Sequence, residues 1–220
     1  MRFKGATNLQ EVSIPDTVTR IGRGAFENTA LTGLELPENL TSIGAEILRG
    51  NTGVSEITIP KSVTEMYYDG VTGNVGAFNG SQVQRAEFEE GITQVPAYAF
   101  QGATNLQEVS IPDTVTRIGD YAFENTALME LELPENLTSI GARILRGNTG
   151  VSEITIPKSV TEMYYDGVTG NVGAFNGSQV QRAEFEEGIT QVPAYAFQGG
   201  NESTGSKHTG YSNKNRERSI

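Results

Sequence analysis

The stretch Leu106–Phe123, LQEVSIPDTVTRIGDYAF, contains one complete structural unit. Apolar side chains stand at its first, fourth and sixth positions, which are Leu106, Val109 and Ile111. The alternation at the last two of these positions is typical of a short strand with one buried face. Pro112 follows directly, and the strand must end there because proline supplies no N–H to a sheet. The first half of the stretch therefore predicts a short strand that proline terminates.

The second half of the stretch predicts a corner followed by a turn. Gly119, like Gly22 and Gly44 in other copies of the pattern, stands where the chain must change direction. We expect a positive φ at these positions, which glycine adopts at little steric cost. The pair Ala122-Phe123 fits a single helical turn that points its aromatic ring inward.

This pattern recurs along the chain at intervals of 22 to 29 residues. The apolar triplets of successive units begin at Leu9, Leu31, Val54, Val83, Leu106, Leu128, Val151 and Val180. One unit of this size buries too little apolar surface to be stable alone. Stacking the units joins their apolar rows into one core, to which each buried Leu or Ile contributes about 1.5–3 kcal/mol. The recurrence thus predicts an elongated stack.

A longer repeat lies over the short one. Residues 5–101, the first block, and 102–198, the second block, are related by an offset of 97 positions and differ at five of them. The differing pairs are Arg23/Asp120, Gly24/Tyr121, Thr32/Met129, Gly33/Glu130 and Glu46/Arg143. Near-identity over this length indicates a recent duplication.

The unit resembles the BspA-like class of leucine-rich repeats, whose signature has the form L-x-x-V-x-I-P-x-x-V-T-x-I-G-x-x-A-F. Leu106–Phe123 matches every fixed position of it, and the resemblance covers about 200 of the 220 residues. The family often has cysteine three residues after the phenylalanine. In this chain the same column holds Thr29, Asn51, Ser81 and Ala103.

The resemblance implies a right-handed α/β solenoid of about eight units over residues 1–200. A parallel sheet would form its concave face, and short strands or helical turns its convex side. Residues 201–220 lack the pattern and are expected to be a polar, disordered tail. The family resemblance also implies a bacterial or protist surface protein that binds proteins, cells or matrix and has neither catalytic activity nor a cofactor.

Composition argues against several classes of partner. The net charge of −11 and the pI of about 4.6 disfavour nucleic acid, whose phosphates require a basic surface. The absence of cysteine excludes a disulfide scaffold and a cysteine-ligated zinc site. No apolar run is long enough to cross a bilayer, so membrane insertion is not expected. Because the chain starts directly in repeat sequence, without an apolar leader, it is expected to be either cytosolic or a fragment of an exported protein. The repeats favour the fragment, and with it an extracellular or cell-surface location.

Exposed positions of the predicted strands form two columns that together carry nine Glu and two Arg. The candidate ligand-binding residues in these columns are Glu11, Glu35, Glu56, Arg85, Glu87, Glu108, Glu130, Glu132, Glu153, Arg182 and Glu184. Such a face would attract a basic partner and speed its encounter. Alternatively, the glutamates only keep a wide sheet soluble and unpaired.

A glycine-rich insertion, present once in each block, supplies a second candidate site. Its tyrosines are Tyr67 and Tyr68, repeated as Tyr164 and Tyr165. Paired tyrosines can stack on a sugar or anchor a protein contact, or they can fold back over the flank of the stack. No metal is expected, because the acidic and amide residues of the insertion lack the spacing of a calcium loop.

Motifs for catalysis are missing from the sequence. His208, the only histidine, lies in the polar tail, and no nucleophile elbow or phosphate loop is present. Three interpretations remain open. The first is a non-enzymatic module that binds a protein or a glycan. The second is a structural spacer or end-to-end assembly module, because both ends of the array lack a polar cap. The third and least favoured is a β-helix enzyme acting on polysaccharide.

Overall fold

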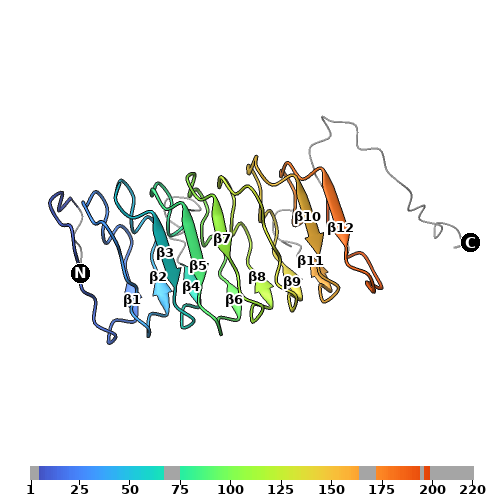
Figure 1. Ribbon diagram of the computed structural model, residues 1–220, viewed down its shortest axis with the longest axis horizontal. Helices are drawn as coiled ribbons and strands as arrows, with labels where there is room; N and C mark the ends of the chain where they lie inside the picture. The colour runs from blue at the N-terminus through green and yellow to red at the C-terminus, as the bar shows by residue number, and fades with distance from the viewer. Residues whose placement is uncertain (1–4, 67–74, 164–171, 194–195, 199–220) are drawn as a thin grey trace, which may run out of the picture.

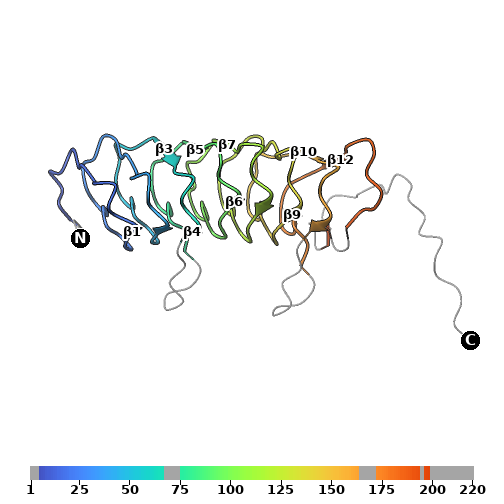
Figure 2. The same ribbon diagram turned by 90° about the horizontal axis from the view of Figure 1, so that it is seen from below.

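The computed structural model of this chain describes residues 5–66, 75–163, 172–193 and 196–198. The chain winds in successive coils that stack along one long axis, from the first block at one end to the second block at the other (Figure 1). Each coil runs from one side of the stack to the opposite side and back (Figure 2). This arrangement is the stack of units that the short sequence period predicts.

The longer strands form parallel sheets on one side of the stack. β3 (Glu56–Ile59), β5 (Arg85–Phe88) and β7 (Glu108–Ser110) make one sheet in the order β3-β5-β7, and β10 (Glu153–Ile156) pairs with β12 (Arg182–Phe185). The segments 11–14, 33–36 and 130–133 occupy the corresponding places in the remaining units. We call this side the long-strand face.

Two-residue strands line the other side of the stack (Figure 2). They are β1 (Arg20–Ile21), β2 (Ser42–Ile43), β4 (Glu65–Met66), β6 (Gln94–Val95), β8 (Arg117–Ile118), β9 (Ser139–Ile140) and β11 (Glu162–Met163). These strands pair in parallel in the orders β1-β2-β4 and β11-β9-β8-β6. Because each of these strands pairs with its counterpart in a neighbouring coil, the sheets hold the coils in register, with a break between β4 and β6.

The core lies between the two sheets and runs the length of the stack. Ile57 and Ile59 of β3 point into it and are almost fully buried, while their neighbours on the strand are exposed. Phe78, Phe100 and Phe123 lie in a row, with ring centroids 5.0 and 6.2 Å apart and nearly parallel planes. The inward direction predicted for these rings is therefore correct, and the rings extend the pooled core from one coil to the next.

The predicted helical turns are wrong: no helix occurs among the described residues, so the fold consists of parallel strands and turns. The residues before and after each Ala-Phe pair explain this difference. Gly24 and Asn28 have φ values of 58° and 55°, and Tyr121 and Asn125 have 57° and 54°. Left-handed residues on both sides of the pair leave only three positions between them, which is too few for a right-handed helical segment.

The reason given for the corner glycines also needs correction. Gly44 and Gly119 are not among the described residues with positive φ. Instead, a Cβ placed on Gly44 would overlap the backbone nitrogen of Arg23, and one on Gly119 would overlap the backbone nitrogen of Ala97. Glycine is needed at these corners because neighbouring coils approach too closely for any side chain.

Strands predicted at 12–14, 34–36 and 131–133 are not formed, although their residues lie where the sequence places them. A single backbone bond, from Thr32 N to Gln10 O at 3.2 Å, continues the ladder between the first two of these segments. The long-strand face is therefore a series of sheets with interruptions, and one interruption lies between β7 and β10.

Candidate functional site

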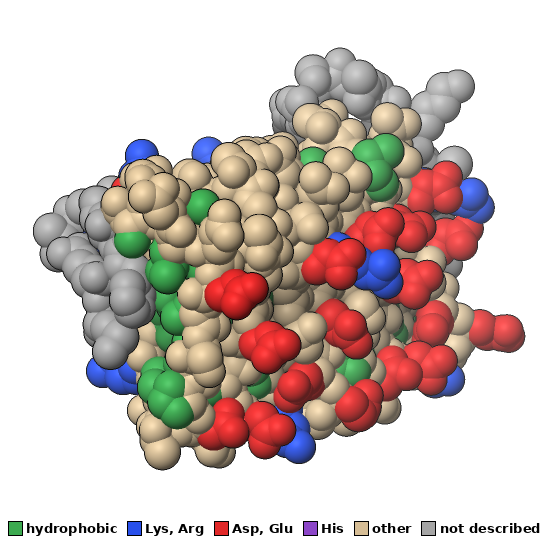
Figure 3. Space-filling model, turned by 60° about the vertical axis from the view of Figure 1, so that its left-hand side comes forward, with side chains coloured by type: hydrophobic (Ala, Val, Ile, Leu, Met, Phe, Trp, Pro, Cys, Tyr) green, Lys and Arg blue, Asp and Glu red, His purple; other side chains and the backbone are tan. Residues whose placement is uncertain are grey.

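Parallel pairing places the predicted charged columns side by side on the long-strand face. Glu56 is opposite Arg85, which is opposite Glu108, and the same register sets Glu153 opposite Arg182. All the column candidates are exposed: Glu11, Glu35, Glu56, Arg85, Glu87, Glu108, Glu130, Glu132, Glu153, Arg182 and Glu184. Figure 3 shows acidic side chains gathered in rows over one face, with few Lys or Arg side chains among them.

The two arginines on this face contact glutamates but do not cancel the negative charge of the face. Arg85 Nη1 lies 3.7 Å from Glu108 Oε2, and Arg182 Nη1 lies 3.8 Å from Glu153 Oε2. Arg182 also contacts Glu184. These side chains are more than half exposed, so each pair contributes at most about 1 kcal/mol to stability. Nine carboxylates against two guanidinium groups leave the face negative.

A hollow on this face lies across the second block and has a volume of about 460 Å³. Five carboxylates and one guanidinium line it, from Glu130, Glu132, Glu153, Glu184, Glu186 and Arg182. Leu131, Leu133, Ile154 and Pro157 also border it. We call it the acidic hollow. It can accept an extended cationic side chain, whose stem would contact the apolar lining while its charge reaches the carboxylates.

A second hollow of about 300 Å³ adjoins the first along the face. Glu130 and Glu132 line both hollows, and Arg85, Glu108 and Met129 complete the charged and apolar lining of the second. The two hollows therefore share a ridge at residues 130–132. The ridge coincides with the interruption of the sheet between β7 and β10.

A buried asparagine links the two coils beside this interruption. Asn148 is fully buried, and its Nδ2 donates to the carbonyl oxygens of Thr126 and Leu128 at 3.1 and 3.0 Å. Its Oδ1 accepts from the backbone N–H groups of Gly150 and Val151 at 3.2 and 2.9 Å. The side chain thus satisfies backbone groups of two neighbouring coils directly before 130–133 and β10, two segments that do not pair.

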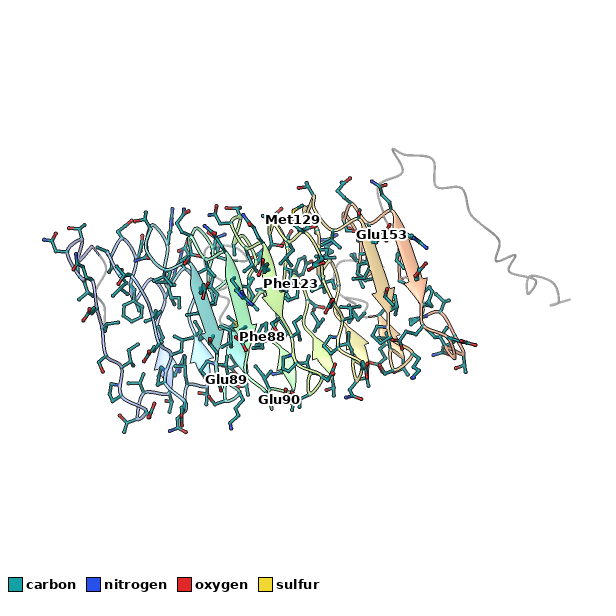
Figure 4. All side chains as sticks on the ribbon, in the orientation of Figure 1. Phe88, Glu89, Glu90, Phe123, Met129 and Glu153 are labelled. Atoms are coloured by element: carbon teal, nitrogen blue, oxygen red, sulfur yellow. The ribbon has the colours of Figure 1, made fainter. Side chains whose placement is uncertain are left out.

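Met129 is the functional candidate that the sequence did not single out. It is 69% exposed, the highest value among the large apolar residues described, and it lies on the upper part of the long-strand face (Figure 4). The first block has Thr32 at this position, and the adjacent Glu130 replaces Gly33. The available signal was that two of the five differences between the blocks, Thr32/Met129 and Gly33/Glu130, fall together on the exposed face.

The second predicted site lies in parts of the chain that the structure does not describe. The candidates Tyr67, Tyr68, Tyr164 and Tyr165 lie outside the described residues. Over the described ranges, no group of three or more His, Cys, Asp or Glu is arranged to hold a metal ion. Within the same part of the chain, no helix could cross a bilayer.

The cysteine column of the family holds buried polar residues with a structural role. Thr29 is 5% exposed, and its Oγ1 donates to the carbonyl oxygen of Phe26 at 2.8 Å. Thr126 makes the same bond to Phe123 at 2.9 Å, and Asn51 repeats the four bonds of Asn148 in the first block. These side chains satisfy backbone groups inside the stack and are not available to a ligand.

Comparison with one solved structure gives the same fold. A leucine-rich repeat protein from Bacteroides ovatus superposes with a TM-score of 0.53 at 20% identity, over 90% of this chain and 60% of that one. A leucine rich cell surface protein from Faecalibacterium prausnitzii gives a TM-score of 0.44 at 23% identity, over 87% and 64%. The chain thus spans about three fifths of the length of these two proteins. No curated protein sequence matches the chain.

The family comparison covers almost the whole sequence. The model described as "BspA type Leucine rich repeat region (6 copies)" matches residues 1–70 and 74–204. The matched ranges contain both blocks, and they include the stretch Leu106–Phe123 that carries the signature. The chain belongs to the BspA-type leucine-rich repeat family.

Proposed function

We propose that this chain is a non-catalytic binding module whose long-strand face binds a basic segment of a protein partner. The acidic hollow carries the proposal, because it sets five carboxylates around one guanidinium in a concavity with an apolar lining. A lysine or arginine side chain is complementary to such a site in both charge and shape. The glutamates of neighbouring strands extend the same charge along the face.

The exposed Met129 adds an apolar contact beside the carboxylates. Methionine adapts its shape to different partners, and Met129 borders the second hollow next to Glu130. A partner that alternates basic and apolar residues would therefore contact both hollows across the ridge. Charge steers the encounter, whereas the apolar contacts slow dissociation.

A lysine-rich peptide of sixteen residues is the probe for this function. Binding of the full chain should be measurable by fluorescence anisotropy at low salt and should weaken steeply as salt rises, since exposed charges are screened beyond roughly 10 Å at 0.1 M. An uncharged glycine-serine peptide of equal length serves as the control ligand. Equal binding of the two peptides would refute the proposal.

The position of the site is tested by charge reversal. Glu130→Lys with Glu153→Lys reverses two carboxylates of the acidic hollow, and we expect affinity for the lysine-rich peptide to fall at least about tenfold. Glu65→Lys with Glu162→Lys makes the same change in net charge on β4 and β11 of the opposite sheet, where both glutamates are exposed. This control should lose much less affinity. Equal losses would show that only net charge matters.

The cellular location and the handedness of the stack are inferred from the family and belong to this proposal. The module would act outside the cell or on its surface, as a right-handed stack of about eight units within residues 1–200. A glycan ligand at the tyrosine-containing insertions is the alternative, and a glycan array compared with the lysine-rich peptide separates the two. Exclusive retention of glycans would place the site at the insertions instead of the acidic hollow.

A structural spacer is the second candidate function. The two blocks differ at only five of 97 positions, so lengthening by whole blocks would leave the packing between coils unchanged. A spacer would tolerate reversal of the carboxylates and would retain no partner from a screen of matrix proteins and glycans. Retention that depends on Glu130 and Glu153 favours the binding module.

A further inference from the structure

Carboxylates recur at every second coil in each of the two columns of the long-strand face. In the first column, glutamate occupies alternate coils, at Glu11, Glu56, Glu108 and Glu153. In the second column, two residues further along each strand, it occupies the coils between, at Glu35, Glu87, Glu132 and Glu184. Glu130 is the ninth glutamate and lies outside this alternation. The face therefore carries two rows of carboxylates with a step of two coils.

Parallel pairing sets the length of this step. Glu87 of β5 lies opposite Thr58 of β3 on one side and opposite Ser110 of β7 on the other. Because neighbouring strands of a sheet are about 4.8 Å apart, carboxylates two coils apart are separated by about 9.6 Å along the stack. The coils stack along a nearly straight axis (Figure 2), so the step repeats in one direction.

A ligand chain in the polyproline II conformation has a matching period. It has three residues per turn and a rise of about 3.1 Å per residue, so every third side chain points the same way at intervals of about 9.3 Å. An extended strand repeats its side-chain direction every 6.7 Å or about that, and two turns of an α-helix advance about 10.8 Å. The mismatch with the carboxylate step is therefore about 0.3 Å for polyproline II and about 1.2 Å for the α-helix.

We propose that the partner segment is a polyproline II helix with Lys or Arg at every third residue, and that it lies along the stack over the second column. This inference rests on the proposed function, since it specifies the conformation and the charge spacing of the basic segment. Each cationic side chain reaches one glutamate of the second column. Glu132 and Glu184 of that column also line the acidic hollow, so the segment crosses the hollow.

The residues between the glutamates favour the second column over the first. In the first column, Arg85 and Arg182 stand on intervening coils, and each lies beside a glutamate of that column. In the second column, the intervening coils carry hydroxyl side chains, which are Ser13, Thr58, Ser110 and Thr155. Within the described part of the chain, Arg182 contacts Glu184, and no cation pairs with the other three glutamates of the second column. A cationic ligand therefore meets carboxylates without a competing guanidinium at three of the four steps.

The hydroxyl side chains of the second column complement the backbone of such a ligand. A polyproline II chain makes no internal hydrogen bonds, so its carbonyl oxygens need donors from outside the chain. Thr58 and Ser110 flank Glu87 in the strand register and are exposed, and each hydroxyl can donate one hydrogen bond. Because a proline-rich segment is already ordered, it loses little conformational freedom on binding.

Two peptides of twelve residues test the charge spacing with the full chain. One repeats Lys-Pro-Pro, and the other has the same composition with its lysines placed so that they point to different sides of the helix. We expect the regular peptide to bind at least about tenfold more tightly at equal salt, measured by fluorescence anisotropy. Equal affinity of the two peptides, or binding of the lysine-rich peptide alone, would overturn the inference and leave the proposed function standing. Failure of all three peptides to bind would refute the proposed function itself.

Paired substitutions in the first block test which column the ligand follows. Glu35→Gln with Glu87→Gln removes two carboxylates of the second column, and Glu11→Gln with Glu56→Gln removes two of the first column at the same step. All four glutamates are exposed, and none of them lines the acidic hollow. We expect affinity for the regular peptide to fall at least about tenfold in the first double variant and less than about twofold in the second. Equal losses would overturn the assignment to the second column.

A third peptide tests the conformation of the ligand. A Lys-Gly-Ser repeat of the same length keeps the lysine spacing but is a flexible coil. We expect it to bind the full chain at least about fivefold more weakly than the Lys-Pro-Pro repeat, because it must lose conformational freedom to adopt one extended form. Equal affinity of the two regular peptides would show that the face does not select a polyproline II helix and would overturn the inference.

Discussion

Arg23 of one coil contacts Glu46 of the next, with Nη2 and Oε2 2.9 Å apart. Arg49 contacts the same carboxylate from the other side, at 3.0 Å. The side chain of Glu46 is only 9% exposed, so both arginines compensate a charge that has lost most of its water. The pair lies in the turns that follow the corner glycines and links successive coils outside the sheets.

The second block replaces this pair with a different set of contacts. Asp120 and Arg143 stand where the first block has Arg23 and Glu46, so the two charges are exchanged. Arg143 donates to the hydroxyl of Tyr121 at 3.2 Å, and its guanidinium carbon lies 5.8 Å from the centroid of that ring. Three of the five differences between the blocks therefore belong to one cluster and compensate one another.

Replacing Glu46 alone by its second-block counterpart should destabilise the protein, whereas replacing all three residues of the cluster together should not. Glu46→Arg places a third positive charge beside Arg23 and Arg49, and we expect the free energy of unfolding to fall by about 1–3 kcal/mol, allowing for the partial exposure of both arginines. Adding Arg23→Asp and Gly24→Tyr reproduces the second block and should restore most of the loss. Urea unfolding measures both values, and additive losses across the three substitutions would contradict the coupling.

The sequence predicts β3 and β10, where a proline follows an alternating pair, although the same pattern before Pro15, Pro37 and Pro134 forms no strand. β3 ends at Ile59 before Pro60, and β10 ends at Ile156 before Pro157. It fails for the turns, because left-handed residues there are not marked by glycine. Glu46 and Arg143 have φ values of 56° and 54°, which no propensity scale would assign to them.

The acidic columns could be predicted and the hollows could not. Side chains alternate in a strand, so the exposed positions of β5 and β10 follow directly from the apolar ones. The acidic hollow depends on the place where the sheet is interrupted. Beside that interruption, Asn148 donates to the carbonyl oxygen of Leu128, twenty residues earlier in the chain. A local pattern contains no information about such a contact.

Asn51 and Asn148 should be among the most sensitive polar residues of the stack. Asn51→Ala would leave two carbonyl oxygens and two N–H groups without partners in a buried position, and we expect a loss of about 2–4 kcal/mol. Asn39→Ala is the control, since Asn39 also donates to a backbone carbonyl of the neighbouring coil but is exposed. Its loss should stay near 0.5 kcal/mol or below, as expected of a solvent-exposed bond. Equal losses in urea unfolding would show that burial does not decide the effect.

Gly53 and Gly33 form a matched pair of tests, because a neighbouring coil approaches Gly53 closely and leaves open space around Gly33. A Cβ on Gly53 would overlap the carbonyl oxygen of Leu31, which is backbone and cannot move aside without shifting the coil. Gly53→Ala should therefore lower the midpoint of thermal unfolding clearly. A Cβ on Gly33 meets nothing within 4 Å, and Gly33→Ala should be neutral or stabilise by about 0.4–1 kcal/mol through the unfolded state. A neutral Gly53→Ala would contradict the packing of these two coils.

Phe100 and Phe197 offer a direct comparison of one side chain in two environments. They stand 97 residues apart in identical local sequence, and each stacks on the phenylalanine of the preceding coil, at 5.0 and 5.4 Å. Phe100 also has a ring on its other side, Phe123 at 6.2 Å. Phe100→Ala should cost about 3–5 kcal/mol, as for a buried ring.

Phe197→Ala should cost about half as much or less, because that ring is already 39% exposed. Urea unfolding measures both losses. Equal losses in the two variants would mean that the second ring, Phe123, adds nothing to the burial of Phe100.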